Sequence, residues 1–325
     1  MQIKKEGVAL KQYNYGKFFK KYGTILGFIL LCIGFTILTP VFITPNNILT
    51  ILRQIAMLSI LSAGLTVVMI SKRIDLSVAY LASLAGIAVA ALSKDAGLPL
   101  GAAVLFGTLI VLMFGALNGL LVAYLGIPDF IATLSVGFLA SGVNQAYTHG
   151  KAITGLTKQF SIFAQDKILG FIPNAIIFMA IFLIIIALLL ERTRFGRYVY
   201  SIGGNEEATN LSGINTKFIL FCTFLVCALG ASLTGIVMTS RLGNAHPLAC
   251  DGLLMDAIAA VYLGGTAFKE GEPNLLGTFI GALIIGVLGN GLTLLNVPYY
   301  NQDIIQGIVI IVAVAVTSVM RTRKK

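Results

Sequence analysis

Nucleotide-binding and catalytic motifs are missing from this sequence of 325 residues. A phosphate-binding loop needs the pattern G-x-x-x-x-G-K-[ST], because its glycines let backbone N–H groups surround the phosphates. Gly150 and Lys151 come nearest to it, but the earlier glycine and the hydroxyl residue are both missing. Neither H-E-x-x-H nor G-x-S-x-G occurs. We therefore predict no catalytic residue, no cofactor site and no NTPase activity on this chain.

Cysteine and histidine are few, and their spacing does not suggest a metal or redox site. The four cysteines form no C-x-x-C motif, so we interpret them as small apolar residues in spans and one loop residue. The two histidines fall in predicted loops without a second histidine nearby, and we interpret them as polar loop residues. A redox or metal role is the alternative. The six residues are Cys32, Cys222, Cys227, Cys250, His149 and His246.

Acidic residues in the apolar part of the chain lie near predicted span ends, at Asp75, Asp129 and Asp303. A proton- or sodium-coupled carrier usually needs carboxylates near the membrane midplane, so this distribution argues against one. Uncharged polar side chains suit a neutral, hydroxyl-rich solute better. For each of them the alternative is a hydrogen bond between helices. The candidates for a transport pathway are Asn118, Asn144, Gln145 and Asn290.

One polar stretch, residues 191–217, interrupts the apolar sequence and contains the pattern of a short helix. Asn205 can cap its start, and Glu206 and Glu207 place negative charge where the helix dipole favours it. Gly213 follows about two turns later, where a left-handed residue ends many helices. A helix this short is marginal in water. We therefore expect it to be stabilised by packing against something else.

Composition predicts the elements that carry these residues. The chain is 57% hydrophobic and 11% charged, whereas soluble domains carry roughly 25% charged residues. Several apolar runs reach the length of about 20 residues needed to cross a bilayer. We predict an all-α polytopic membrane protein with about ten transmembrane helices. The predicted spans are residues 22–39, 55–70, 76–92, 99–125, 130–147, 173–190, 218–238, 253–266, 275–295 and 303–320.

Positive charge is concentrated at the two ends of the chain, which has a formal net charge of +10. The positive-inside rule then places both termini and the 191–217 loop in the cytoplasm. This distribution explains the charge without a nucleic-acid partner. We predict a basic cytoplasmic segment 1–21, a transmembrane domain 22–320 that includes the cytoplasmic loop 191–217, and a basic cytoplasmic tail 321–325.

Two local features leave alternatives open. The run 253–266 is short for a full crossing, so a broken or half-spanning helix is an alternative there. Gly115 with Gly119, and Gly277 with Gly281, have the four-residue spacing that lets helices approach closely in lipid. Such glycines serve either packing inside the chain or a face for a second copy of it.

Five motifs follow one another along the chain from the first span to the last. They are IDLSV at 74–78, DFIATLSVGFLASGVNQAYTHGKAITG at 129–155, GRYVYSIGGNEEATNLSGI at 196–214, DAIAAVYLGGT at 256–266 and GNGLTLL at 289–295. Together they resemble the ribose-type permease subunits of bacterial ABC importers, within the branched-chain amino acid/ribose binding-protein-dependent permease family.

The resemblance implies that the chain translocates a monosaccharide, with D-ribose or a related pentose as the first expectation, and that it is no enzyme. ATP and Mg²⁺ would be bound by separate cytoplasmic ATPase subunits. The other implied partners are a periplasmic or lipid-anchored sugar-binding protein and a second permease chain, identical or different. The implied location is the bacterial cytoplasmic membrane, as a multi-pass protein.

Residues 207–213 resemble the E-A-A-x-x-x-G coupling pattern of such permeases, with Thr209 in place of the second alanine. The resemblance implies that this helix docks on the ATPase and passes its movement to the membrane spans. A capped, rigid helix can transmit a push that a loose loop cannot. The implied coupling residues are Gly204, Asn205, Glu206, Glu207, Ala208 and Gly213.

The chain departs from the family pattern at several positions. Lys72 and Arg73 stand where two glycines commonly precede IDLSV, and Ala79 stands where a glycine follows it. Leu254 replaces a usual glutamate, and residues 268–274 read FKEGEPN where a glycine-rich turn is expected. These changes leave the identity of the solute open, as well as pairing with a different permease chain.

A different class of protein is the alternative. An ATP-independent secondary carrier or channel for a small polar solute would share the apolar spans, and its 191–217 loop would be regulatory. An ATPase that copurifies with the chain separates the two classes.

Overall fold

Helices make up most of the part of the chain that the structure describes. The computed structural model describes residues 15–168, 170–266 and 271–322. Residues 1–14 of the predicted basic segment 1–21, residues 268–270 of the FKEGEPN stretch and residues 323–325 of the predicted tail lie outside the described residues. In chain order the elements are α1 (Tyr15–Leu38), α2 (Pro45–Ile70), α3 (Val78–Lys94), α4 (Leu100–Gly119), the π-helical turn η1 (Leu120–Tyr124), α5 (Asp129–Thr148), the 3₁₀ turn η2 (Lys158–Phe163), β1 (Lys167–Ile168), β2 (Ile172–Pro173), α6 (Asn174–Arg192), α7 (Arg194–Gly204), α8 (Glu206–Leu211), α9 (Thr216–Leu242), α10 (Leu253–Gly265), α11 (Leu275–Leu294) and α12 (Tyr299–Thr322).

A helix covers each of the ten predicted apolar runs, which confirms the all-α polytopic interpretation. In the part of the chain that the structure describes, five helices are long and apolar enough to cross a bilayer: α2, α4 with η1, α6, α9 and α11. Helices α3 and α10 have 17 and 13 residues. At about 1.5 Å per residue they reach about 25 and 20 Å, less than the roughly 30 Å of the hydrocarbon core. The short α10 fits the half-spanning alternative.

Two boundaries differ from the sequence prediction. Helix α2 begins at Pro45 instead of residue 55, because proline is pre-organised for the first turn, where its missing N–H is not needed. Helix α1 begins at Tyr15 instead of residue 22. The predicted border between a basic segment and the transmembrane domain therefore falls inside a helix.

Helix α2 runs through the middle of the bundle and is flanked by α6, α9, α10 and α11. Every residue from Ile55 to Ser71 is buried. A helix that is apolar on all sides is stable only when other helices surround it, and this sequence meets that condition. Helix α2 therefore forms the core of the bundle.

Helix α9 packs against α2, α3 and α4 at positions occupied by glycine. A Cβ atom added at Gly235 would overlap the carbonyl oxygen of Ala82 in α3, and one at Gly64 would lie 3.1 Å from the carbonyl oxygen of Cys227. The glycines that have four-residue spacing in the sequence also allow close helix packing. Gly115 and Gly119 face α9, and Gly277 and Gly281 face α10. These four glycines pack helices inside the chain.

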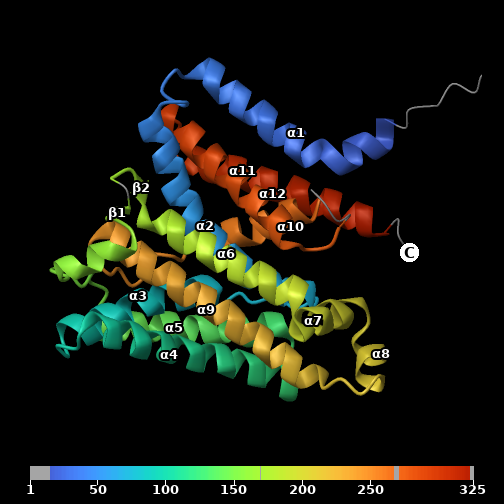
Figure 1. Cartoon of the computed structure of the whole chain (residues 1–325), viewed down its shortest axis with the longest axis horizontal. Helices are drawn as coiled ribbons and strands as arrows, with labels where there is room; N and C mark the ends of the chain where they lie inside the picture. Colours follow the sequence, from blue (N-terminus) through green and yellow to red (C-terminus); the bar gives the residue numbers. More distant parts are fainter. Residues whose placement is uncertain (1–14, 169, 267–270, 323–325) are drawn as a thin grey trace, which may run out of the picture.

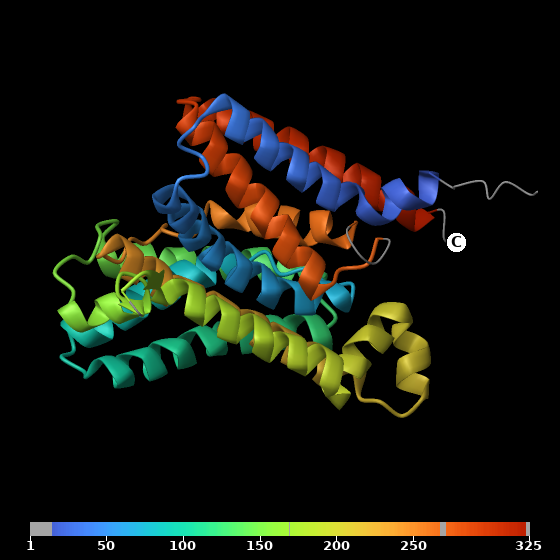
Figure 2. The same ribbon diagram turned by 45° about the horizontal axis from the view of Figure 1, so that its top comes forward.

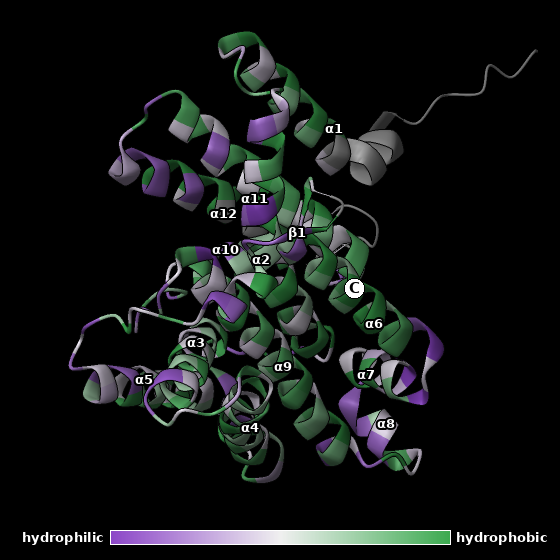
Figure 3. Ribbon diagram, turned by 60° about the vertical axis from the view of Figure 1, so that its left-hand side comes forward, coloured by the Kyte–Doolittle hydropathy of each residue, from purple (hydrophilic) through white to green (hydrophobic). Residues whose placement is uncertain are grey.

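The outer surface of the bundle is apolar, with exposed residues such as Ile37, Met113 and Ile184. Hydrophilic residues gather instead at the ends of the bundle and on α7 and α8, as Figure 3 shows. This is the pattern expected when lipid surrounds the helices. Helix α1 begins, and α12 ends, at the same end of the bundle as α7 and α8 (Figures 1 and 2).

The opposite end carries the long connection between α5 and α6. Its strands β1 and β2 pair antiparallel, with Lys167 opposite Pro173 and Ile168 opposite Ile172. Ser240 near the end of α9 donates a hydrogen bond of 2.7 Å to the carbonyl oxygen of Phe160. These contacts fold the connection over the end of α9.

Candidate functional site

The polar 191–217 loop contains two helices, of which the sequence analysis predicted only the second. The unpredicted one, α7, is capped by Thr193, whose hydroxyl oxygen accepts a hydrogen bond of 3.2 Å from the N–H of Gly196. Its apolar residues Val199 and Ile202 are buried. The loop is thus a folded helical hairpin that packs on the bundle, not a loose connector.

Both predicted ends of α8 are confirmed. The side-chain oxygen of Asn205 accepts a hydrogen bond of 3.0 Å from the N–H of Ala208. Beyond the last turn, Gly213 has a φ of 82°, the left-handed conformation that glycine adopts at no steric cost. Asn205 also ends α7, so one residue forms the junction between the two helices.

The two glutamates of α8 have different surroundings. Glu206 is half-buried and faces the bundle, whereas Glu207 is exposed. Thr209 is buried and shares a hydrogen bond of 2.9 Å with Ser201 of α7. Leu211 is 84% exposed, which is unusual for a leucine on a polar helix. The outer face of α8 therefore offers an acidic residue and an apolar residue to a partner.

Helix α7 lies in close contact with the end of α2. A Cβ atom at Gly203 would overlap the carbonyl oxygen of Ile70, whereas one at Gly204 would meet no atom within 4 Å. Burial, with the carboxylates of Glu191 and Glu272, raises the pKa of Tyr200 above its ordinary value. The hairpin is thereby seated on the central helix.

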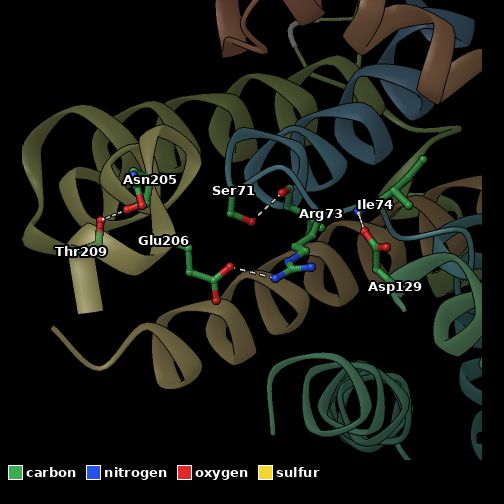
Figure 4. Close-up of polar contacts among 8 residues, drawn as sticks. Ser71, Arg73, Ile74, Asp129, Asn205, Glu206 and Thr209 are labelled. Atoms are coloured by element: carbon green, nitrogen blue, oxygen red, sulfur yellow. Dashed lines mark hydrogen bonds and ion pairs between the residues drawn. The ribbon is translucent and has the colours of Figure 1, made fainter. Parts of the chain in front are cut away.

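The connection between α2 and α3, residues 71–77, is called the elbow below, and it contacts the junction of α7 and α8. Arg73 donates to Glu206 in an ion pair of 2.8 Å (Figure 4). The ammonium group of Lys72 donates to the carbonyl oxygen of Gly204 at 3.1 Å. Lys72 has a φ of 60°, a left-handed conformation that disfavours a residue with a Cβ by about 1–2 kcal/mol.

The elbow is also bonded to the start of α5. The backbone N–H of Ile74 donates to a carboxylate oxygen of Asp129 at 2.7 Å, as Figure 4 shows. The N–H of Leu76 donates to the hydroxyl of Thr133 at 3.0 Å. Asp129 stands in the first turn of α5, where negative charge is favourable. A continuous set of polar contacts therefore runs from α8 through the elbow to α5.

Three of the four proposed pathway residues are buried and already hydrogen-bonded. Asn118 donates to the hydroxyl of Ser77 at 2.7 Å, and Asn144 donates to the carbonyl oxygen of Pro247 at 3.4 Å. Asn290 and Asn47 exchange two amide hydrogen bonds, each 3.0 Å long, between α11 and α2. All three therefore make hydrogen bonds between elements, while the buried amide oxygens of Asn118 and Asn144 have no partner among the described residues.

Gln145 differs from them, because it is exposed and bonds only to Ser141 of its own helix, at 3.2 Å. The structure does not gather the four residues into one group. A role for them in the pathway stays a prediction.

One of the cysteines reaches the elbow, since the thiol of Cys227 is hydrogen-bonded to the carboxyl group of Asp75. All four cysteines are free, with Cys227 and Cys250 buried. His149 has a left-handed φ of 50° at the end of α5, and a ring nitrogen of His246 accepts from the N–H of Leu248. Among the described residues no three His, Cys, Asp or Glu side chains are placed to share a metal ion.

Sequence reasoning missed Lys72, Arg73 and Leu211 as functional candidates. The two basic residues stood out as departures from the glycine pair, but their partners lie more than 130 positions further along the chain. Leu211 carried a signal that could have been used, since it is a single large apolar residue within the polar run NEEATNLSG.

Known proteins resemble this chain over most of its length. A family described as "Branched-chain amino acid transport system / permease component" matches residues 47–314. The Ribose import permease protein RbsC of Escherichia coli is 42% identical over 292 residues, covering 86% of this chain and 88% of its own. The Bacillus subtilis protein of the same name is 39% identical over 306 residues, 94% of each chain.

A third relative, the D-allose transport system permease protein AlsC of Escherichia coli, is 35% identical over 315 residues, 97% of this chain and 96% of its own. No solved structure matches the chain. The family match extends from the start of α2 into α12 and so includes the elbow, α7 and α8. The chain therefore belongs to the family of permease components that serve branched-chain amino acid and related transport systems.

Proposed function

We propose that this protein is the membrane permease subunit of an ABC importer that moves a monosaccharide across the bacterial cytoplasmic membrane. The observation that carries the proposal is α8, a capped helix with an exposed outer face that is seated on the central helix through α7. Nothing in the sequence equips the chain to hydrolyse ATP itself. The energy then comes from separate subunits, which bind ATP and Mg²⁺ and dock on α8.

The proposed topology has ten spans with both termini, α7 and α8 in the cytoplasm. Two observations support it: the basic residues at the two ends of the sequence, and the start of α1 and the end of α12 at the same end of the bundle as α8 (Figure 2). A second permease chain, identical or different, completes the transport pathway. A periplasmic or lipid-anchored sugar-binding protein delivers the solute to the opposite end.

D-Ribose or a related pentose is the proposed solute. The proposal draws on the two ribose import permeases that are 42% and 39% identical to this chain. The relative named for D-allose makes a hexose the main competitor. Thermal stabilisation of the cognate binding protein by a panel of sugars decides between them, since a ligand stabilises the protein that binds it.

Coupling follows from how α8 is held. Closure of the ATPase subunits pushes on the exposed face formed by Glu207, Ala208 and Leu211. The push reaches α2 through the contact between Gly203 and Ile70, because packed helices shift as rigid bodies and do not deform smoothly. The solute pathway then opens by movement of whole helices.

The test is the variant Glu207→Lys in the complete importer. We expect it to lose the ATPase subunit during purification in mild detergent and to lose ATP-driven uptake, because it reverses a charge on the docking face. Insertion into the membrane should be unchanged, since Glu207 is exposed. The control is Lys158→Glu, a charge reversal at the opposite end, which should retain the ATPase. Normal uptake by Glu207→Lys at normal protein level would contradict the proposal.

A further inference from the structure

The junction between α7 and α8 is held from both sides by two consecutive residues of the elbow. Lys72 donates to Gly204, the residue before Asn205, and Arg73 pairs with Glu206, the residue after it. Asn205 itself has an extended backbone, with φ of −153° and ψ of 108°. A single non-helical residue between two helices is where their relative angle can change. Lys72 and Arg73 therefore act at the position where the hairpin could bend.

Local conformation alone does not favour this arrangement. Lys72 adopts a left-handed backbone that would suit glycine better. The left-handed turn places the side chains of Lys72 and Arg73 toward the hairpin. Arg73 and Glu206 form the one ion pair present among the described residues, with side chains 34% and 40% exposed. The strained Lys72 and the ion pair of Arg73 both contact the junction of α7 and α8. Together they indicate a role beyond a surface contact.

The elbow is fixed on its other side as well. Besides the bonds to Asp129 and Thr133, α5 approaches the elbow at Gly137, where an added Cβ atom would lie 3.2 Å from the Cα of Ser77. A displacement of the elbow therefore has to move α5. The same displacement is imposed on the elbow whenever α8 tilts, as long as Lys72 and Arg73 keep their bonds.

We propose that Lys72 and Arg73 are positioning residues, an elbow clamp that fixes the angle between α7 and α8 and passes the tilt of α8 to α5. The inference rests on the proposed function of α8 as the ATPase-docking helix. It adds a second route for the movement, beside the one through α7 and α2. Without the clamp the hairpin bends at Asn205 and part of the ATPase movement is lost.

The test is an exchange of charges in the complete importer reconstituted with its ATPase and binding protein. Arg73→Glu and Glu206→Arg should each lower the solute moved per ATP hydrolysed by about two- to fivefold, the range expected from a half-exposed ion pair. The exchanged variant, Arg73→Glu with Glu206→Arg, should restore most of that ratio. Restoration distinguishes the clamp from a merely structural role, because an altered fold is not repaired by a second charge reversal.

A second variant tests the clamp without introducing a new charge that could disturb folding. Lys72→Gly with Arg73→Gly removes both contacts and relieves the left-handed strain, so it should insert normally while the transport ratio falls about two- to fivefold. The control, Lys158→Gln, removes a lysine charge at the opposite end and should keep the wild-type ratio. A wild-type ratio in the double-glycine variant, or no restoration in the exchanged variant, would overturn the clamp. Failure of the wild-type complex to use ATP at all would instead overturn the proposed function.

Discussion

The contacts inside the bundle and those at its α7–α8 end are of opposite kinds. Around α9 the helices meet through Gly64, Gly86 and Gly235, where an added Cβ atom would crowd the neighbouring backbone or, at Gly86, the side chain of Thr239. At the hairpin one such glycine contact occurs, Gly203 against Ile70, and the other contacts are caps, one ion pair and single hydrogen bonds between partly exposed groups.

This difference teaches which part of the molecule can move. Close-packed helices have few intermediate arrangements, because any separation loses many contacts at once. Half-exposed polar contacts exchange readily with water and each contributes little. The bundle is therefore suited to shift as rigid bodies, and the hairpin is suited to change its contacts when a partner docks.

The largest effect is expected from Gly235→Ala in the bundle. The new methyl group would overlap the carbonyl oxygen of Ala82, so α9 must move away from α3. We expect a loss of about 3 kcal/mol of stability, near the upper end for overpacking. Thermal unfolding in detergent measures it. Gly34→Ala, where an added Cβ meets nothing within 4 Å, is the control, and equal unfolding temperatures for the two variants would contradict the rigid-bundle interpretation.

A smaller loss of stability but a large loss of transport is expected from Gly203→Ala. The added methyl group would push α7 away from the carbonyl oxygen of Ile70, while the bundle stays intact. We expect stability to fall by about 1–2 kcal/mol and ATP-driven uptake to fall at least tenfold. The neighbouring variant Gly204→Ala has free space and is the matched control for helix propensity. Equal uptake by the two variants would show that transport does not need the close contact between α7 and α2.

The smallest effect is expected from the buried polar pair of Asn47 and Asn290 inside the bundle. Asn290→Ala leaves the amide oxygen of Asn47 without its partner, which should destabilise the protein by about 1–2 kcal/mol. Since the pair is buried, we expect no change in the solute concentration for half-maximal uptake. Asn47→Leu with Asn290→Leu should recover part of the stability. A changed half-maximal concentration at normal stability would instead place Asn290 in the solute pathway.

Sequence patterns were sufficient where the information is local. Apolar runs located ten of the helices that the structure describes, and Asn205 and Gly213 located both ends of α8, since caps depend on residues three or four positions apart. Helix α7 escaped prediction because its apolar face is small, with two buried residues at Val199 and Ile202, and because it ends in two glycines that weaken helix propensity.

Contacts between distant parts of the chain could not be predicted from one sequence. Periodicity does not tell which neighbour a polar side chain meets, so the hydrogen bonds of Asn118 to Ser77 and of Asn290 to Asn47 could not be predicted. The pairing of Arg73 with Glu206 depends on how α2 and α7 pack, which no local pattern records.

The source of energy is the central claim, and uptake into proteoliposomes tests it most directly. Purified permease with its binding protein, but without an ATPase subunit, should not accumulate sugar against a gradient. Addition of the ATPase subunit with ATP and Mg²⁺ should start accumulation, and the wild-type α8 should be required for it. Accumulation against a gradient by the permease alone, with no nucleotide present, would contradict the account.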